Sequence, residues 1–131
     1  MKYVEIHCDG SHLLHNNAAF GGYEVKVDGQ IVRRWKGRVE AANSLEAEFQ
    51  AVITALKWAL KKKHRYVTVY TDCRGLERMV RNGPVPGGKY ARFVRKIIAM
   101  SKLIGFVWFQ WVPREQNRRA DMLCRAARKY A

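Results

Sequence analysis

Three β-rich runs open this 131-residue sequence, and an alternation of helical and β patterns follows them, which leaves few folds open. The runs cover residues 2–9, 20–27 and 30–39. Asp28-Gly29 lies between the last two runs and is a strong signal for a tight hairpin. Consecutive strands joined by short turns predict an antiparallel meander at the start of the fold.

Helical patterns begin after this meander. Asn43 has the residue type of a helix N-cap, and Glu46 stands three positions later, as in a capping box. Apolar residues then repeat at helical spacing as far as three lysines at 61–63, which suit the negative end of a helix dipole. The remaining predicted elements are a strand at 66–71, helices at about 73–81 and 89–103, a strand at 106–112 and a helix at 117–130. This order predicts an α/β fold with a mixed five-stranded sheet flanked by helices, and the length predicts one domain, residues 1–131.

Net charge is the most informative bulk property of the chain. Lysine and arginine number 25 against 11 acidic residues, a formal net charge of +14. Such an excess favours nucleic acid as a partner over a membrane, because no segment shows a basic face opposite bulky apolar residues. No apolar run approaches the roughly 20 residues that cross a bilayer, and the N-terminal residues lack the apolar core of a signal peptide. We therefore expect an intracellular, cytoplasmic protein without membrane contact, and, since no large apolar interface stands out, a monomer.

Two residue types are expected to serve packing. The cysteines lack the spacing of a zinc site or a disulfide framework and are expected to be reduced, buried thiols: Cys8, Cys73 and Cys124. The tryptophans are expected to pack in or against the core: Trp35, Trp58, Trp108 and Trp111.

Four carboxylates occupy positions of a particular kind. Asp9 and Asp72 follow predicted strands, Glu48 lies one turn inside the long helix, and Asp121 lies near the start of the last helix. The carboxyl ends of parallel strands meet at one edge of a sheet, where open α/β sheets bind ligands. Each acid alone fits a turn, a cap or a dipole partner. Together they predict a site for hard divalent cations, because converging carboxylates repel one another without them.

Four short motifs carry a resemblance to a known family. They are CDGS at residues 8–11, NSLEAEFQA at 43–51, YTDC at 70–73 and NRRAD at 117–121. In this order they resemble the signatures of type 1 ribonucleases H, and the similarity extends over essentially the whole chain. It implies a ribonuclease H-like fold with sheet order 3-2-1-4-5. It also implies an endonuclease that hydrolyses the RNA strand of RNA–DNA hybrids and leaves 5′-phosphate and 3′-hydroxyl ends.

The resemblance also assigns roles to residues. Asp9, Glu48, Asp72 and Asp121 are expected to be catalytic acids that hold two Mg²⁺ or Mn²⁺ ions for a two-metal mechanism. The chain resembles the shorter members, which lack a basic protrusion and the loop histidine before the last acid. Arg114 stands in that loop. It is expected to act in catalysis by binding a phosphate, which a guanidinium does well.

The expected substrate is an RNA–DNA hybrid, with double-stranded RNA as a further candidate. Recognition of ribose hydroxyls needs short polar groups near the acids. We expect four residues to bind substrate: Gly10, Ser11, Asn17 and Asn43. Two other classes remain open, a ribonuclease-H-like DNA-processing nuclease such as a resolvase or recombinase core, and a hybrid-binding module that has lost catalysis. Cleavage of DNA separates the first from a ribonuclease H, and uptake of divalent metal separates the second.

Overall fold

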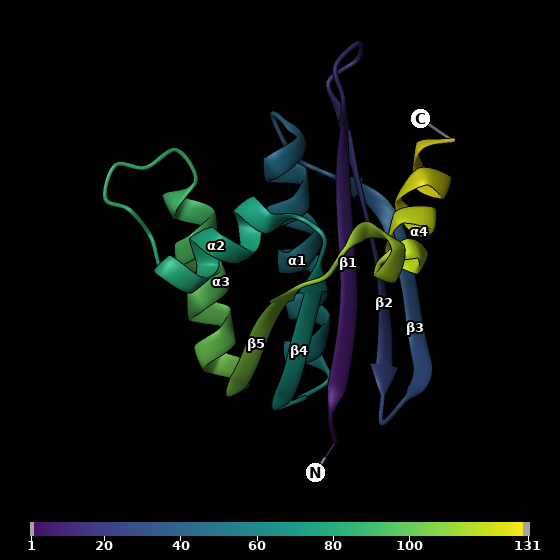
Figure 1. The fold of residues 1–131 in the computed structure, drawn as a ribbon, viewed down its shortest axis with the longest axis vertical. Coiled ribbons are helices and arrows are strands. Elements are labelled where there is room, and N and C mark those ends of the chain that lie inside the picture. The colour runs from purple at the N-terminus through teal and green to yellow at the C-terminus, as the bar shows by residue number, and fades with distance from the viewer. Residues whose placement is uncertain (1, 130–131) are drawn as a thin grey trace.

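A computed structural model describes residues 2–129 of the chain (Figure 1). Its elements are β1 (Val4–Leu13), β2 (Ala18–Val27), β3 (Gln30–Val39), α1 (Ser44–Lys61), β4 (Tyr66–Thr71), α2 (Arg74–Asn82), α3 (Ala91–Ile104), β5 (Phe106–Trp111), a short 3-10 helix η1 (Arg114–Gln116) and α4 (Arg118–Arg128). The predicted order of elements is confirmed. The last two residues of the chain, including the predicted helix end at 130, lie outside the described part.

The strands form one mixed sheet in the order β3-β2-β1-β4-β5, as predicted. β1, β2 and β3 are the antiparallel meander, and β1, β4 and β5 run parallel to one another. The β2–β3 turn places Asp28 and Gly29 at φ of 49° and 82°. Positive φ at both central residues is typical of a type I′ hairpin, so the prediction from Asp28-Gly29 is confirmed.

β1 is longer than predicted, and Asp9 does not end it. The strand continues to Leu13, which pairs with Ala18 of β2, so that the β1–β2 hairpin projects above the rest of the sheet (Figure 1). The pairing of β1 with β4 stops earlier, at Cys8 and Thr71. Asp9 therefore lies just beyond the last β1–β4 pair, beside the point where β4 ends.

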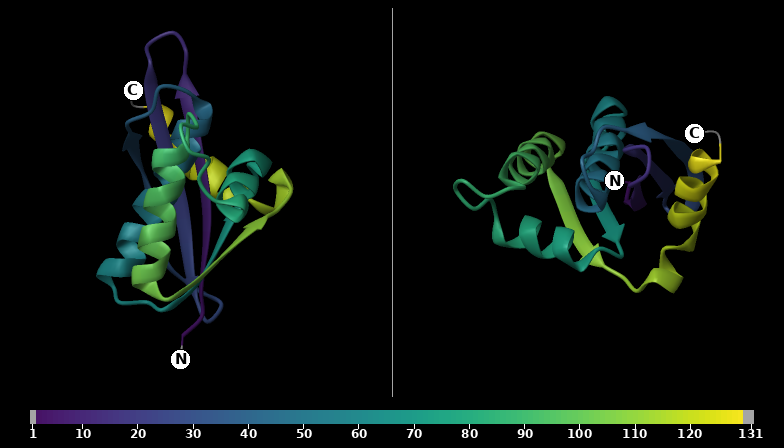
Figure 2. Two further views of the ribbon diagram at one scale, coloured as in Figure 1. Left: turned by 90° about the vertical axis from the view of Figure 1, so that its left-hand side faces the viewer. Right: turned by 90° about the horizontal axis from the view of Figure 1, so that it is seen from above.

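Helices cover both faces of the sheet (Figure 2). α1 and α3 lie on one face, and α4 lies on the other, over β1 and β2. α1 buries the stripe that contains Phe49, Val52 and Leu56 against the sheet. The predicted N-cap is confirmed, because the Glu46 N–H donates to Asn43 Oδ1 at 2.9 Å. The Glu46 carboxylate accepts from the Ala42 N–H, one residue before the cap, and not from Asn43 as in a standard capping box. Packing in the core thus fixes α1 against the strands that carry the acids. No helix in residues 2–129 is long and apolar enough to cross a membrane.

The packing residues mostly behave as predicted. The three cysteines are free, with Cys8 and Cys124 buried and Cys73 half-buried. Trp35 stacks on Tyr23 with ring centroids 5.4 Å apart. Trp108, on the edge strand β5, packs less than the others: it is 52% exposed and stacks on Phe106 with ring centroids 6.2 Å apart. The expected packing role is therefore only partly met by Trp108.

Candidate active site

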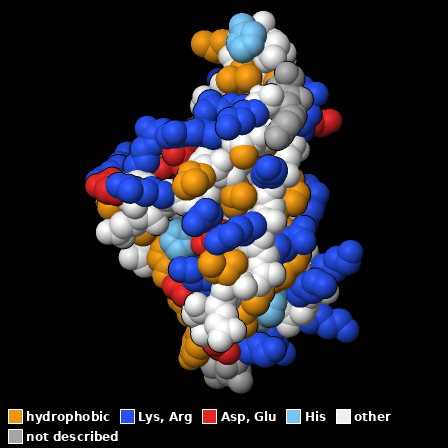
Figure 3. Space-filling model, turned by 90° about the vertical axis from the view of Figure 1, so that its right-hand side faces the viewer, with side chains coloured by type: hydrophobic (Ala, Val, Ile, Leu, Met, Phe, Trp, Pro, Cys, Tyr) orange, Lys and Arg blue, Asp and Glu red, His pale blue; other side chains and the backbone are white. Residues whose placement is uncertain are grey.

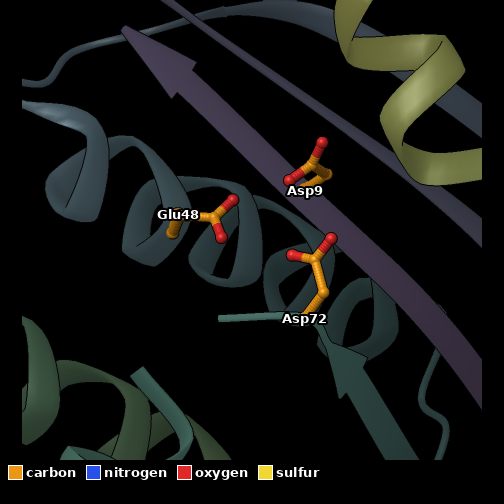
Figure 4. Close-up of side chains that lie close together, drawn as sticks. All are labelled: Asp9, Glu48 and Asp72. Atoms are coloured by element: carbon orange, nitrogen blue, oxygen red, sulfur yellow. The ribbon is translucent and has the colours of Figure 1, made fainter. Parts of the chain in front are cut away.

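Three carboxylates converge where β1, α1 and β4 meet. Asp9 comes from β1, Glu48 from the second turn of α1, and Asp72 from the residue after β4. One carboxylate oxygen from each lies within 4.8 Å of the others. Figure 4 shows the three side chains pointing toward one another. The sequence predicted this convergence, and the structure brings these three acids together.

Gly10 allows β1 and α1 to approach so closely. A Cβ at this position would lie 2.3 Å from the Ala47 carbonyl oxygen and 2.6 Å from the Glu48 backbone nitrogen, closer than real Cβ contacts come. The Gly10 N–H donates to Glu48 Oε1 and so holds this carboxylate toward β1. Glycine is thus needed here for its size, and its N–H orients one of the acids.

We expect the Gly10→Ala variant to unfold at a lower urea concentration than the parent. Overpacking of a closed contact typically costs about 1–3 kcal/mol of unfolding free energy, because backbone atoms have to shift. Gly75→Ala in α2 is the matched control, since nothing lies within 4 Å of the added Cβ, and alanine in a helix is favoured by about 1 kcal/mol. Equal stability of Gly10→Ala and the parent would show that β1 and α1 separate freely at this point.

Electrostatics at the cluster favour a bound cation. Burial raises the pKa of Asp9 to about 6, with the charges of Asp72 and Asp121 adding to the rise, and burial raises the pKa of Glu48 well above its usual range. A hydrogen bond between the side chains of Asp9 and Glu48 adds to the rise of the Glu48 pKa and opposes the rise of the Asp9 pKa. Burial raises the pKa of Asp72 as well, although the Arg114 charge opposes this. The three carboxylates offer only oxygen ligands, and they repel one another when they are ionised. Such a set fits Mg²⁺ or Mn²⁺, because a divalent cation removes this repulsion.

Asp121 adjoins this cluster on the side of Asp9. Its charge contributes to the raised pKa values of both Asp9 and Asp72, and a hydrogen bond between the Asp9 and Asp121 side chains adds to the rise at Asp9. Yet among residues 2–129 the acids that could share one ion are the three named above. The carboxylate of Asp121 is paired with Arg125, with 2.7 Å between Arg125 Nη2 and Asp121 Oδ2. The fourth predicted acid therefore contacts both Asp9 and Arg125.

Arg114 lies where the sequence placed it, next to the acids. It lines a hollow of about 450 Å³ together with Asp9, Gly10, Glu48, Asp72 and three neighbouring residues. Its charge lowers the pKa of Asp72, which agrees with this position. A cation at the mouth of an acidic site is well placed to meet a phosphate that the site binds.

The other predicted substrate residues lie outside that hollow. Ser11 Oγ accepts a hydrogen bond from Cys124 Sγ at 3.3 Å. Asn17, in the β1–β2 turn at φ 54°, lies 2.7 Å from the His12 ring nitrogen and lines a separate hollow with Arg38. Asn43 caps α1 and donates to Tyr90 Oη at 3.3 Å. Of the four predicted substrate residues, only Gly10 lines the acid hollow.

Two residues that hold the acids in place were not foreseen. Trp111 Nε1 donates to the Asp72 carbonyl oxygen at 3.1 Å, and the Arg74 guanidinium stacks 3.7 Å from the Trp111 ring centroid.

Asn117, 1% exposed, donates to the Cys8 carbonyl oxygen at 2.8 Å, just before Asp9, and its amide also lowers the pKa of Asp72. Its Oδ1 has no protein hydrogen-bond partner within the described residues. The only sequence signal for either was the place of Asn117 in the NRRAD motif.

Known proteins resemble this chain in sequence and in fold. The family model described as reverse transcriptase-like matches residues 7–127. EbsB of Enterococcus faecalis, named as a hydrolase, is 30% identical over 84 residues, which are 63% of this chain and 62% of EbsB. The chain thus matches less than two thirds of that relative's length.

Solved structures of ribonucleases H share the fold. RNase H1 from the halophilic archaeon Halobacterium salinarum aligns with a TM-score of 0.90 at 23% identity, over 98% of this chain and 99% of that one. The N-terminal RNase H domain of Rv2228c from Mycobacterium tuberculosis has a TM-score of 0.87 at 21% identity, over 99% of this chain and 96% of the other. LC11-RNase H1, solved with an RNA/DNA hybrid, has a TM-score of 0.83 at 21% identity, over 95% of each chain. With its family match over residues 7–127 and this sheet order, the chain belongs to the reverse transcriptase-like family and has the ribonuclease H-like fold.

Proposed function

We propose that this protein is a metal-dependent endonuclease that hydrolyses the RNA strand of RNA–DNA hybrids. The observation that carries the proposal is the convergence of Asp9, Glu48 and Asp72 within 4.8 Å, in a ribonuclease H-like fold. LC11-RNase H1, which shares this fold, was solved with an RNA/DNA hybrid. The net charge of +14 supports a nucleic-acid substrate, with hybrid first and double-stranded RNA second.

Each residue of the site has a role in this proposal. When bound here, two Mg²⁺ or Mn²⁺ ions would supply Lewis-acid stabilisation and an activated water, for a hydrolysis that leaves 5′-phosphate and 3′-hydroxyl ends. Asp9, flanked by Glu48, Asp72 and Asp121, would contribute to both metal positions. Glu48 and Asp72 would hold one ion and Asp121 the other. The chain's own contribution is to fix these oxygens before substrate arrives.

Residues around the acids bind the substrate. Arg114 contacts a phosphate at the mouth of the acid hollow. Gly10 and Ser11 lie on the strand beside the scissile position, and Asn43 at the start of α1. Asn17 and Arg38, in their separate hollow, are placed for a more distant part of the duplex. These contacts follow the backbone and the ribose hydroxyls and do not read sequence.

One cleavage assay tests the proposal. Labelled RNA–DNA hybrid, double-stranded RNA, single-stranded RNA and duplex DNA are each incubated with Mg²⁺, Mn²⁺ or EDTA. We expect metal-dependent cutting of the hybrid, 5′-phosphate ends on the products and no cutting of DNA. Cutting of DNA would instead indicate a DNA-processing nuclease, and tight hybrid binding without any cutting would indicate a binding module.

Metal affinity should depend on pH in a defined direction. Because burial raises the pKa of Asp9 to about 6 and raises the pKa of Glu48 well above its usual range, the metal-free site holds protons at low pH that a cation must displace. We expect Mg²⁺ to bind more tightly at pH 7.5 than at pH 5.5, with proton release detectable by calorimetry in buffers of different ionisation enthalpy. The Glu77→Gln variant, which removes an acid of α2 paired with Arg81, should keep the same pH dependence. Affinity that does not change over this range would contradict the raised pKa values.

A further inference from the structure

A row of aromatic side chains lies on one face of the sheet, at the end opposite to the acids. We call this row the aromatic strip, and its members are Tyr3 just before β1, Tyr66 at the start of β4, and Phe106 and Trp108 on β5. Ring centroids are 6.1 Å apart for Tyr3 and Tyr66, and 5.2 Å apart for Tyr66 and Phe106. The rings of Tyr66, Phe106 and Trp108 are nearly parallel, with interplanar angles of 0° and 18°. The four rings therefore form one continuous surface.

The aromatic strip is left open to solvent. On this face, the helix among residues 2–129 is α4, which packs over β1, β2 and β3. The lower parts of β4 and β5 lie beyond α4 and are uncovered on this side (Figure 1). Tyr3 is 60% exposed and Phe106 51% exposed, much like Trp108. A contiguous patch of large apolar side chains in water is typical of an interaction site.

The composition of the strip fits nucleobases better than a second copy of this chain. Flat aromatic rings stack on bases, and such stacking tolerates any base because every base has a π face. Thr68 and Gln110 lie on the same face beside Trp108 and offer hydroxyl and amide groups to base edges. A second copy would bring together two proteins of net charge +14, which repel one another, whereas a polyanion is attracted.

Charges near the strip also favour a polyanion. Glu5 lies on the open face, but Lys26 of β2 is its partner in register, so a cation stands beside this acid. Tyr70 Oη also donates to Glu5 Oε2 at 3.4 Å. Lysine and arginine side chains gather on the adjoining face that carries α4 and β3 (Figure 3). Phosphates that link stacked bases would be attracted from that side.

The strip continues the sheet face onto which the acids open. Asp9 and Glu5 are four positions apart on β1, so their side chains lie on the same side of the sheet. Glu5 pairs in register with Thr68, and Thr68 pairs with Trp108. Thr68 comes four residues before Asp72, which is roughly 13 Å along an extended strand. A nucleic-acid strand at the acids therefore reaches the strip within a few nucleotides.

We propose that the aromatic strip binds single-stranded nucleic acid by stacking its bases on Phe106 and Trp108. A single strand exposes the faces of its bases, which a duplex keeps stacked on one another. Binding at the strip does not depend on cleavage at the acids. It is therefore a second site, and it can be tested in EDTA, where a metal-dependent nuclease does not cut.

The first experiment measures binding by fluorescence anisotropy in EDTA with labelled single-stranded RNA, single-stranded DNA and blunt RNA–DNA hybrid. Phe106→Ala and Trp108→Ala should each weaken single-strand binding about tenfold, because each loses one stacking contact. Trp108→Phe should keep most of the affinity, and blunt hybrid should bind all variants alike. Leu103→Ala is the matched control, since it removes an exposed apolar side chain from α3 on the other face, and it should bind like the parent. The more tightly bound of the two single strands is the preferred occupant.

The second experiment separates stacking from charge and from misfolding. Unlabelled single-stranded RNA should quench tryptophan fluorescence of the parent, and Trp108→Phe should lose this quenching while it still binds. Because no charge is removed, the alanine variants should show the same slope of affinity against salt as the parent. The substituted rings are exposed, so the variants should fold, and circular dichroism checks this.

Three results would decide against the proposal or against the proposed function. Equal single-strand affinity of the parent and both alanine variants would overturn the stacking site. A dimer in sedimentation that Trp108→Ala abolishes would also overturn it, because a second copy would then cover the strip. If the parent cuts no hybrid, the proposed function fails, while the binding measurements in EDTA still decide whether the strip holds a single strand.

Discussion

Replacing Asp9 with asparagine is expected to lower the rate of hybrid cleavage by orders of magnitude while hybrid binding survives or improves. The substitution keeps the shape of the side chain and removes one negative charge from the middle of the acid cluster. Metal binding then weakens, because a neutral amide oxygen is a poorer ligand than a carboxylate for hard cations. A phosphate backbone, in contrast, meets less repulsion. Single-turnover cleavage and anisotropy titration on the same preparation measure the two effects separately.

Glu77→Gln is the matched control for this variant. It also neutralises one acid, but Glu77 lies on α2 and is paired with Arg81 away from the cluster. It should cleave at the parental rate. An Asp9→Asn variant that keeps near-normal activity would remove Asp9 from the mechanism and with it the proposed bridging role.

Arg114→Ala is expected to reduce turnover about ten- to a hundredfold, which corresponds to the loss of one charge-assisted phosphate contact. Arg114 lines both the acid hollow and a second hollow between η1 and α4. Arg114→Lys should recover part of the rate, since it keeps the charge but not the paired N–H donors. Steady-state kinetics with Arg78→Ala as control, an exposed arginine of α2 outside both hollows, distinguish a local role from a general loss of charge. A parental rate in Arg114→Ala would leave η1 without a catalytic side chain.

The sequence predicted the elements well where the signal is local. The Asp28-Gly29 turn, the Asn43 cap and the apolar spacing of α1 each act within a few residues, and each appears in the structure as predicted. The far end of β1 was missed because residues 10–13 lack a β-rich pattern of their own. They are extended because β2 supplies hydrogen-bond partners as far as Ala18.

In the candidate site, too, some contacts could be predicted from the sequence and others could not. The convergence of Asp9, Glu48 and Asp72 could be predicted from the sequence, because parallel strands end at one edge of the sheet. The hydrogen bond from Trp111 to the Asp72 carbonyl joins residues 39 positions apart, and no periodicity in the sequence predicts such a contact. The Asp121–Arg125 pair, in contrast, follows from i,i+4 spacing on the predicted last helix. What this spacing does not reveal is that the Asp121 side chain also contacts Asp9.

The close contact at Gly10 has a thermodynamic consequence for how the site captures a cation. The Gly10 N–H fixes the Glu48 carboxylate to β1, and both β1 and α1 pack in the core. Asp9 on β1 and Glu48 on α1 therefore lose little conformational entropy when an ion binds. Folding of β1 and α1 therefore preorganises this half of the acid cluster before any cation binds.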